Sequence, residues 1–403
     1  MSKFRRAHSL PTTHHTDVHT LVSTDKELDD LVASACNADR YAIDTEFHRE
    51  RTYFPQVALI QMAWDDQLVL IDPLDVDLKP LAKLLEGDGL CVVHAGVQDL
   101  EVLDLSCGTI PKRIFDTQIA AGFLGVPTAS LSSLHDRFLG FSLPKGDRLT
   151  DWLRRPLTED QMKYAASDVE HLLKLTDILQ GQLEDLGRVE WAFEECELLK
   201  DRPRNRRVPE DAILRIKEAR SLKGQAYRVA TATAAWREQR AAESNTPVRQ
   251  VLSDLGIVAI AQQAPTTTDK LRGLRGVESR HLRDGADNEI LTAVQVGIRM
   301  SPSERQPPRA PELPRHLRPV VTLVTAWIAQ LARDHQLDPA LLATRADVES
   351  LLKKDPESRL TKGWRQDLVG KPIAQLVGGE AAVAFDGDGN LVLEARSGKS
   401  LPT

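Results

Sequence analysis

The chain has 403 residues, of which 41% are hydrophobic and 28% charged, so it has enough apolar material for two or three globular domains. Its longest apolar run, 320–332, is interrupted by polar residues and is shorter than the roughly 20 residues of a membrane span. The start is basic but lacks an apolar stretch, so no secretory signal is predicted. Four cysteines without CxxC pairing exclude a zinc ribbon and favour a reduced, cytoplasmic setting.

Charge is unevenly distributed along the chain. Residues 1–200 carry a net charge of −14, residues 201–300 carry +6 and residues 301–403 carry +1. Affinity for phosphate comes largely from Lys and Arg, so the middle of the chain is best suited to bind nucleic acid. Solvated surface charge, or a helical domain that binds protein, explains a modest excess of +6 equally well.

The first half alternates between strand and helix patterns. Residues 1–20 are polar, and we expect a disordered tail. The periodicity that follows predicts a meander of three strands and then strand–helix units. Strands are expected at 41–43, 57–64, 67–71 and 90–93, and helices at 78–85, 97–105, 130–138 and 158–183. Residues 114–124 are expected to begin as a strand and to continue as a helix. This order predicts a mixed α/β sheet domain over residues 21–200.

The second half has helical periodicity, with linkers rich in charge or proline. The polar block Asp201–Arg207 predicts a linker, and residues 201–298 form a predicted helical domain. Its helices are expected over 210–222, 224–245, 247–255, 258–262, 269–274 and 279–298. A proline-rich linker at 299–315 precedes a second helical domain, 316–403, that ends in a hairpin at 383–395.

A weak internal similarity relates the two helical regions. Val251-Leu252-Ser253, leading to Val258, resembles Leu341-Leu342-Ala343, leading to Val348. Two copies of one small module would produce this match. Helical periodicity alone would also produce it.

Four carboxylates fall where they could bind metal. Asp44 and Glu46 are two apart at the end of a buried strand, so they point to one face. Unpaired carboxylates there are costly unless a cation neutralises them. Asp99 lies early in a later helix, and Asp168 shares a helix face with Tyr164. Each acid is unremarkable alone, but together they suit Mg²⁺ or Mn²⁺, and two such ions can promote phosphodiester hydrolysis.

Three motifs carry these acids in order: Asp44-Thr-Glu46-Phe-His-Arg-Glu-Arg-Thr-Tyr-Phe-Pro55, His94-Ala-Gly-Val-Gln-Asp99 and Tyr164-Ala-Ala-Ser-Asp168. They resemble the three exonuclease motifs of ribonuclease D, in the tyrosine-bearing class of the DEDD 3′–5′ exonucleases. Segments 115–121 and 145–161 are similar to ribonuclease D as well. The basic middle resembles the HRDC domain, the helical domain named for helicases and ribonuclease D. The last third resembles a more divergent second copy.

The resemblance implies a ribonuclease-H-like sheet and a site for two divalent ions, Mg²⁺ or Mn²⁺. The implied ligands are Asp44, Glu46, Asp99 and Asp168. Tyr164 would orient or help activate the attacking water; with an ordinary pKa of about 10 it is a poor base by itself. The implied reaction is hydrolysis of RNA from its 3′ end to nucleoside 5′-monophosphates. Stable RNA and tRNA precursors are the expected substrates and partners, and no membrane is involved.

The same resemblance suggests substrate contacts. Phe47 and His94 would meet the terminal nucleotide. Phosphates or bases would be gripped by Lys145, Arg148 and Trp152. Two alternatives stay open, because Trp152 could be a core residue and His94 a satisfied buried histidine. Asp116 is expected to support the site as a helix cap.

Two other functions compete with the exoribonuclease. A 3′–5′ DNA exonuclease acting in repair would use the same metal chemistry, and only contacts to the 2′-hydroxyl would distinguish the two. A non-catalytic nucleic-acid-binding scaffold would not need the complete set of acids, which argues against it.

Overall fold

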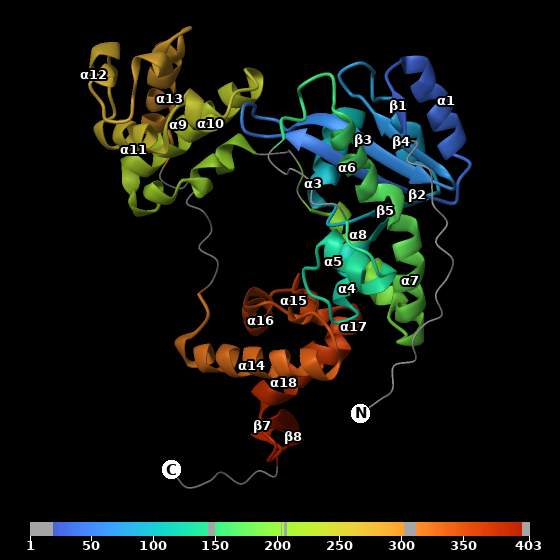
Figure 1. The fold of residues 1–403 in the computed structure, drawn as a ribbon. Helices are drawn as coiled ribbons and strands as arrows, with labels where there is room; N and C mark the ends of the chain where they lie inside the picture. Colours follow the sequence, from blue (N-terminus) through green and yellow to red (C-terminus); the bar gives the residue numbers. More distant parts are fainter. Residues whose placement is uncertain (1–18, 144–149, 203, 205–207, 302–311, 397–403) are drawn as a thin grey trace.

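A computed structural model describes residues 19–143, 150–202, 204, 208–301 and 312–396. Figure 1 shows a sheet domain with one helical domain beside it and a second beneath it. We call residues 209–299 the first helical domain and residues 315–395 the C-terminal helical domain. The structure is thus α/β plus all-α, as the sequence predicts. None of the described helices is long and apolar enough to cross a bilayer.

A six-stranded mixed sheet, ordered β1-β4-β3-β2-β5-β6, forms the first domain. Its strands are β1 (Thr20–Val22), β2 (Arg40–His48), β3 (Gln56–Trp64), β4 (Gln67–Ile71), β5 (Leu90–Val93) and β6 (Arg113–Asp116). The predicted meander is confirmed, because β3 pairs antiparallel with both β2 and β4. Strands β5 and β6 continue the sheet in parallel beyond β2.

Helices cover both faces of the sheet. They are α1 (Asp25–Ala35), α2 (Leu81–Leu85), α3 (Val97–Cys107), α4 (Thr117–Gly122), α5 (Leu131–Leu134) with a π-helical turn to Leu139, α6 (Glu159–Glu170), α7 (Leu172–Asp185) and α8 (Val189–Lys200). One core joins α1, α2 and α3 to side chains such as Ile43 and Met62. The core on the other face joins α4 and α7 to Ala42 and Ala63. Alternate residues of β2 therefore face different layers.

Four features of the first domain differ from the expectations. Strand β1 begins inside the segment expected to be a disordered tail, and neither α1 nor α8 was predicted. The single helix expected over 158–183 is two helices, because His171 leaves helical geometry with φ −111° and ψ 6°.

The first helical domain contains α9 (Gly224–Glu243), α10 (Val248–Val251), α11 (Asp254–Gln263), α12 (Thr268–Arg272) and α13 (Ala286–Arg299). Three 3₁₀ helices complete it: Pro209–Arg215, Lys217–Ser221 and Ser279–Leu282. The expected helix 210–222 is broken because Ile216 is buried in an extended conformation. The expected helix 279–298 is broken at Gly285, whose φ of 82° only glycine adopts readily.

The α-helices of the C-terminal helical domain begin with the same series, a long helix followed by a short helix and a third helix. It contains α14 (Arg318–Asp334), α15 (Pro339–Leu342), α16 (Arg345–Leu352), α17 (Gly363–Arg365), a π-helical turn (Gln366–Gly370) and α18 (Lys371–Gly378). The predicted hairpin is confirmed, with β7 (Ala381–Phe385) antiparallel to β8 (Leu391–Ala395).

Backbone landmarks relate the two helical domains at one constant offset. Asn245 and Gln336 each follow a long helix with a left-handed φ, of 46° and 50°. Leu252 and Ala343 are both extended, with φ −161° and −164°. The next residue in each caps a helix. This favours two copies of one module. The structure pairs Leu252 with Ala343, whereas the sequence similarity pairs Leu252 with Leu342, so the two alignments differ by one residue.

Candidate active site

Three carboxylates converge where β2 meets α6. One oxygen of each lies within 4.8 Å of the others; the residues are Asp44, Glu46 and Asp168. Small side chains let α6 approach the sheet closely, because Ala165 and Ala166 pack on Ala58 in one buried cluster. The predicted i,i+4 relation holds, since Tyr164 and Asp168 lie on the same helix.

Asp99, the fourth acid, approaches β2 from its other face. It lies in the first turn of α3 and is 7% exposed. Its Oδ1 accepts hydrogen bonds from Thr45 Oγ1 at 2.6 Å and from the Thr45 amide at 3.1 Å. Asp99 is therefore tied to the residue between Asp44 and Glu46, but it is outside the cluster of three converging carboxylates.

Burial and mutual repulsion raise the pKa of these acids. Burial raises the pKa of Asp44 well above its ordinary value, and the neighbouring carboxylates raise it further. Burial, then the charges of Asp168 and Asp99, raises the pKa of Glu46 to about 8. Burial raises the pKa of Asp99 to about 6, although hydrogen bonds from Thr45 lower it. Positive charge placed among these acids would favour their ionised form.

Two observations show that this cluster suits hard cations. The converging ligand atoms are all carboxylate oxygens, the type that Mg²⁺ and Mn²⁺ prefer. Gln61 lies directly opposite Asp44 in the β2–β3 register, so both side chains face the same layer. The Gln61 amide is fully buried, and neither of its polar atoms has a hydrogen-bond partner among the described residues. A buried polar group of this kind suits a site that also holds ions or ordered water.

The Trp152 ring lies next to the Tyr164 ring. The two ring centroids lie 6.2 Å apart, and Trp152 is only 8% exposed within the cluster that contains Ala58 and Leu59. This placement favours the core alternative for Trp152.

The two residues expected at the terminal nucleotide have partners of their own. The register of the β2–β3 ladder shifts between Glu46 and Phe47, because Ala58 of β3 has no partner on β2. The Arg49 guanidinium lies over the Phe47 ring, 5.1 Å from its centroid. His94 Nδ1 lies 2.9 Å from Thr117 Oγ1, and burial lowers its pKa, which favours a satisfied histidine. The other two predicted contacts, Lys145 and Arg148, lie outside the described residues.

Sequence reasoning missed two supporting residues. Thr45 was visible between the two acids of the first motif, but its bond to Asp99 is a tertiary contact. Arg155 anchors the segment before α6: it pairs with Asp72 and donates to the Ala58 and Trp152 carbonyls, each at 2.7 Å. The sequence Arg154-Arg155-Pro156 gives no local signal for such a role.

The first helical domain contacts the loop between β2 and β3. Asn245 Oδ1 accepts from the amides of Tyr53 and Phe54 at 3.1 and 3.0 Å. The Tyr53 hydroxyl donates to Glu238 at 2.7 Å. Thus the hairpin that carries two of the acids also contacts the first helical domain, and Figure 1 shows the blue end of this hairpin reaching toward α10.

The linker arginines differ from one another. Arg202 is exposed, whereas Arg204 donates to the Leu199 and Lys200 carbonyls at the end of α8. Arg206 and Arg207 lie outside the described residues.

The sheet, the acids and the tyrosine together define a 3′–5′ exonuclease with helical accessory domains. Residues 19–184 match the family model described as 3′–5′ exonuclease, and residues 227–294 match that of the HRDC domain. A ribonuclease D from Nitrobacter hamburgensis is 35% identical over 382 residues, covering 94% of this chain and 100% of the relative. The crystal structure of Escherichia coli RNase D matches with a TM-score of 0.79 and 32% identity, covering 90% of this chain and 99% of the other.

The chain therefore belongs to the ribonuclease D family and is a 3′–5′ exoribonuclease. This confirms the resemblance found in the motifs. It favours RNA over the DNA alternative and argues against a non-catalytic scaffold. A more distant structure, the catalytic core of RRP6 from Trypanosoma brucei, has a TM-score of 0.56 at 25% identity, covering 70% of this chain and 80% of that core.

Proposed function

We propose that this exoribonuclease trims the 3′ ends of structured RNAs, tRNA precursors among them, and that two divalent ions, Mg²⁺ or Mn²⁺, serve the reaction. The observation that carries the proposal is the convergence of Asp44, Glu46 and Asp168 within 4.8 Å. Asp99, tied to the same strand, completes the proposed ligand set. A cytoplasmic location remains a prediction from the four unpaired cysteines.

Different residues would have different roles in the reaction. When bound, the ions would acidify the attacking water and neutralise the leaving oxygen. Asp44, Glu46 and Asp168 supply carboxylate oxygens from the β2–α6 side, and Thr45 holds Asp99 from the other. The Tyr164 hydroxyl orients the water, with its ring supported by Trp152.

Structured RNA is favoured by the position of the first helical domain. That domain is bonded to the loop following the acids, through Asn245 and Glu238, so RNA held on it would lie next to the site. The E. coli RNase D structure is described as that of an exoribonuclease involved in structured RNA processing.

The test compares 5′-labelled RNA and DNA with 3′ overhangs, in Mg²⁺, Mn²⁺ or chelator. A ladder of one-nucleotide steps on RNA, lost with chelator and with Asp44→Asn, is expected. Asp29→Asn, a change of an exposed acid on α1, is the matched control and should retain the ladder. Equal ladders on DNA would contradict the RNA preference.

Substrate class needs its own comparison. A tRNA precursor with a short 3′ extension should be shortened faster than an unstructured RNA of equal length. Equal rates would argue against structured RNA as the natural substrate.

A further inference from the structure

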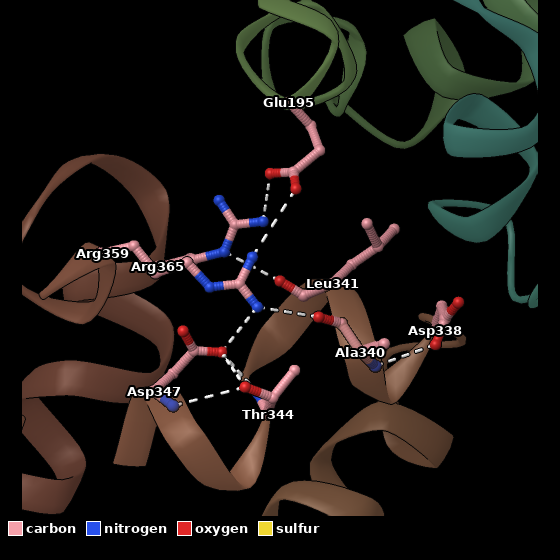
Figure 2. A network of polar contacts seen from close by, with 8 residues as sticks. All are labelled: Glu195, Asp338, Ala340, Leu341, Thr344, Asp347, Arg359 and Arg365. Carbon is pink, nitrogen blue, oxygen red and sulfur yellow. Dashed lines mark hydrogen bonds and ion pairs between the residues drawn. The ribbon is translucent and has the colours of Figure 1, made fainter. Parts of the chain in front are cut away.

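The C-terminal helical domain is fixed to α8 of the exonuclease domain by a buried ionic network. Glu195 on α8 is 8% exposed and pairs with Arg365, which is 5% exposed. Arg359 lies 3.6 Å from the same carboxylate and bonds Asp347 at 2.8 Å. Figure 2 shows both guanidinium groups directed at Glu195 across the boundary. Arg365 also donates to the Leu341 carbonyl at 2.8 Å.

Aromatic packing extends this contact. Trp364 stacks on Trp191 of α8 with centroids 4.8 Å apart and planes inclined by 12°. It also meets the Phe123 ring edge-on, 5.5 Å away. The docked surface therefore combines charge pairing with apolar burial, and it spans both α8 and the end of α4.

Helix α4 is held by this domain at its carboxyl end. The Asp338 amide donates to the Gly122 carbonyl at 2.8 Å. A Cβ atom on Gly122 would lie 2.8 Å from Leu341 Cδ1, so Leu341 can pack this closely only because Gly122 has no side chain. Arg188 adds bonds to the Phe123 and His335 carbonyls, at 2.8 and 2.7 Å.

Asp116 stands at the other end of α4. It is 1% exposed and caps the helix by accepting from the Gln118 amide at 2.8 Å, which confirms the expected cap. Its two oxygens also accept from the Ala95 and Gly96 amides, each at 3.0 Å. Its own amide donates to Cys196 Sγ on α8 at 3.2 Å.

The loop that Asp116 grips leads directly into α3. Ala95 adopts φ 56°, which is costly for a residue with a side chain. Gly96 caps α3 without a side-chain bond, and a Cβ there would lie 2.6 Å from Val93 Cγ2. Asp99 follows in the first turn. A shift of this loop would therefore move the Asp99 carboxylate relative to Thr45.

We propose that Asp116 is a positioning residue for Asp99, and that the C-terminal helical domain holds Asp116 in place through α4 and α8. This inference rests on the proposed metal site. The C-terminal helical domain would thus help to position Asp99, although it contacts the exonuclease domain at α8 and at the end of α4 and not at the acids themselves.

The test uses Asp116→Asn in the full chain, with two readouts. An amide side chain keeps one acceptor but presents an NH₂ group to a backbone donor, so hydrogen exchange at Ala95 and Gly96 should rise. Mn²⁺ binding, followed by the paramagnetic resonance of the free ion, should weaken about tenfold, as for other supports of metal ligands. RNA affinity should stay unchanged.

The matched control is Asp386→Asn. Asp386 accepts from the Asp388 and Asn390 amides in the turn between β7 and β8, so the control alters another aspartate that accepts two amides, without touching the Asp99 loop or the contacts to α4 and α8. Its Mn²⁺ affinity should equal that of the unaltered chain. If Asp116→Asn does not fold, Cys196→Ala perturbs Asp116 in a second way, because it removes the sulfur that accepts from the Asp116 amide. Hydrogen exchange at Ala95 and Gly96 should then rise, and Mn²⁺ affinity should fall, by smaller amounts.

The contribution of the C-terminal helical domain is tested with Glu195→Gln. Hydrogen exchange at the Ala95 and Gly96 amides should rise, and Mn²⁺ affinity should fall. Both changes should be smaller than in Asp116→Asn. Unchanged protection there would overturn the part assigned to the domain. Unchanged Mn²⁺ affinity in Asp116→Asn would overturn the positioning role, whereas a failure of the unaltered chain to bind Mn²⁺ would instead contradict the proposed function.

Discussion

Thr45 links the two faces of β2 by donating a 2.6 Å hydrogen bond to Asp99. Its neighbours Asp44 and Glu46 point to the opposite layer, so one threonine fixes the position of α3 relative to the converging acids. The motif Asp-Thr-Glu thus carries a structural requirement at its middle position as well as two carboxylates.

Replacing Thr45 by Val removes this donor and keeps the branched shape. The Thr45 amide still donates to Asp99, so we expect a stability loss of only about 1 kcal/mol but a fall of about tenfold in the single-turnover rate. Thr176→Val is the control, since Thr176 bonds the Leu172 carbonyl within α7 and this bond involves none of the four acids. An equal loss of rate in both variants would contradict a specific role for Thr45.

Stability in chelator should decline as pH rises. The pKa of Glu46 is about 8 in the folded chain against an ordinary 4.5, so between these values the folded state binds more protons than the unfolded state. The free energy of unfolding then falls with increasing pH across this window. Asp99, with a pKa of about 6, adds to the fall between about pH 4 and 6.

Urea unfolding from pH 5 to 8 measures this slope. Glu46→Gln should flatten it, and Asp29→Asn should leave it unchanged. Added Mn²⁺ should restore more stability at pH 8 than at pH 5, because fewer protons must leave the acids. A slope of opposite sign would contradict the proton linkage.

The two interpretations of Trp152 predict different kinetics. As a core residue beneath Tyr164, Trp152→Ala should cost about 3 to 5 kcal/mol of stability and lower kcat without raising KM. A residue that grips a base would instead raise KM. Trp64→Ala, which truncates a buried tryptophan in the core on the other face, should destabilise comparably and leave the kcat of the remaining folded protein unchanged.

The contact between Asn245 and the β2–β3 loop should matter for long RNA only. Asn245→Gly keeps the left-handed φ accessible and removes the oxygen that bonds Tyr53 and Phe54. We expect weaker binding of structured RNA and an unchanged rate on a dinucleotide. Gln336→Gly alters the equivalent position of the C-terminal helical domain and should bind RNA normally. Equal binding by both variants would show that the contact does not serve RNA.

Local patterns predicted much of the fold. Strand alternation located β2, β3 and β4 and placed Asp44 and Glu46 on one face. The expected set of four acids also included Asp99, which the structure leaves outside the converging cluster. Strand β1 has only three residues, too few to show a period. Ile216 breaks a helix because it is buried in an extended conformation, which is set by its neighbours in space and leaves no mark in the pattern.

The supporting contacts were less predictable, because they join residues far apart in sequence. Nothing adjacent to Glu195 indicates Arg365, and nothing adjacent to Asp116 indicates the Ala95 and Gly96 amides. Trp152 shows the same limit: its motif left a nucleotide contact and a core position open, and its ring contact with Tyr164 is a tertiary feature.

The stacking of Trp191 on Trp364 has a consequence for how the protein is made. Ribosomal synthesis releases Trp191 and Phe123 well before Trp364, so the apolar surface of α8 and α4 stays open to solvent in the nascent chain. Exposed surface of this kind invites aggregation or chaperone binding until its partner arrives. The catalytic half of the enzyme therefore reaches its finished, shielded form only after Trp364 has been translated.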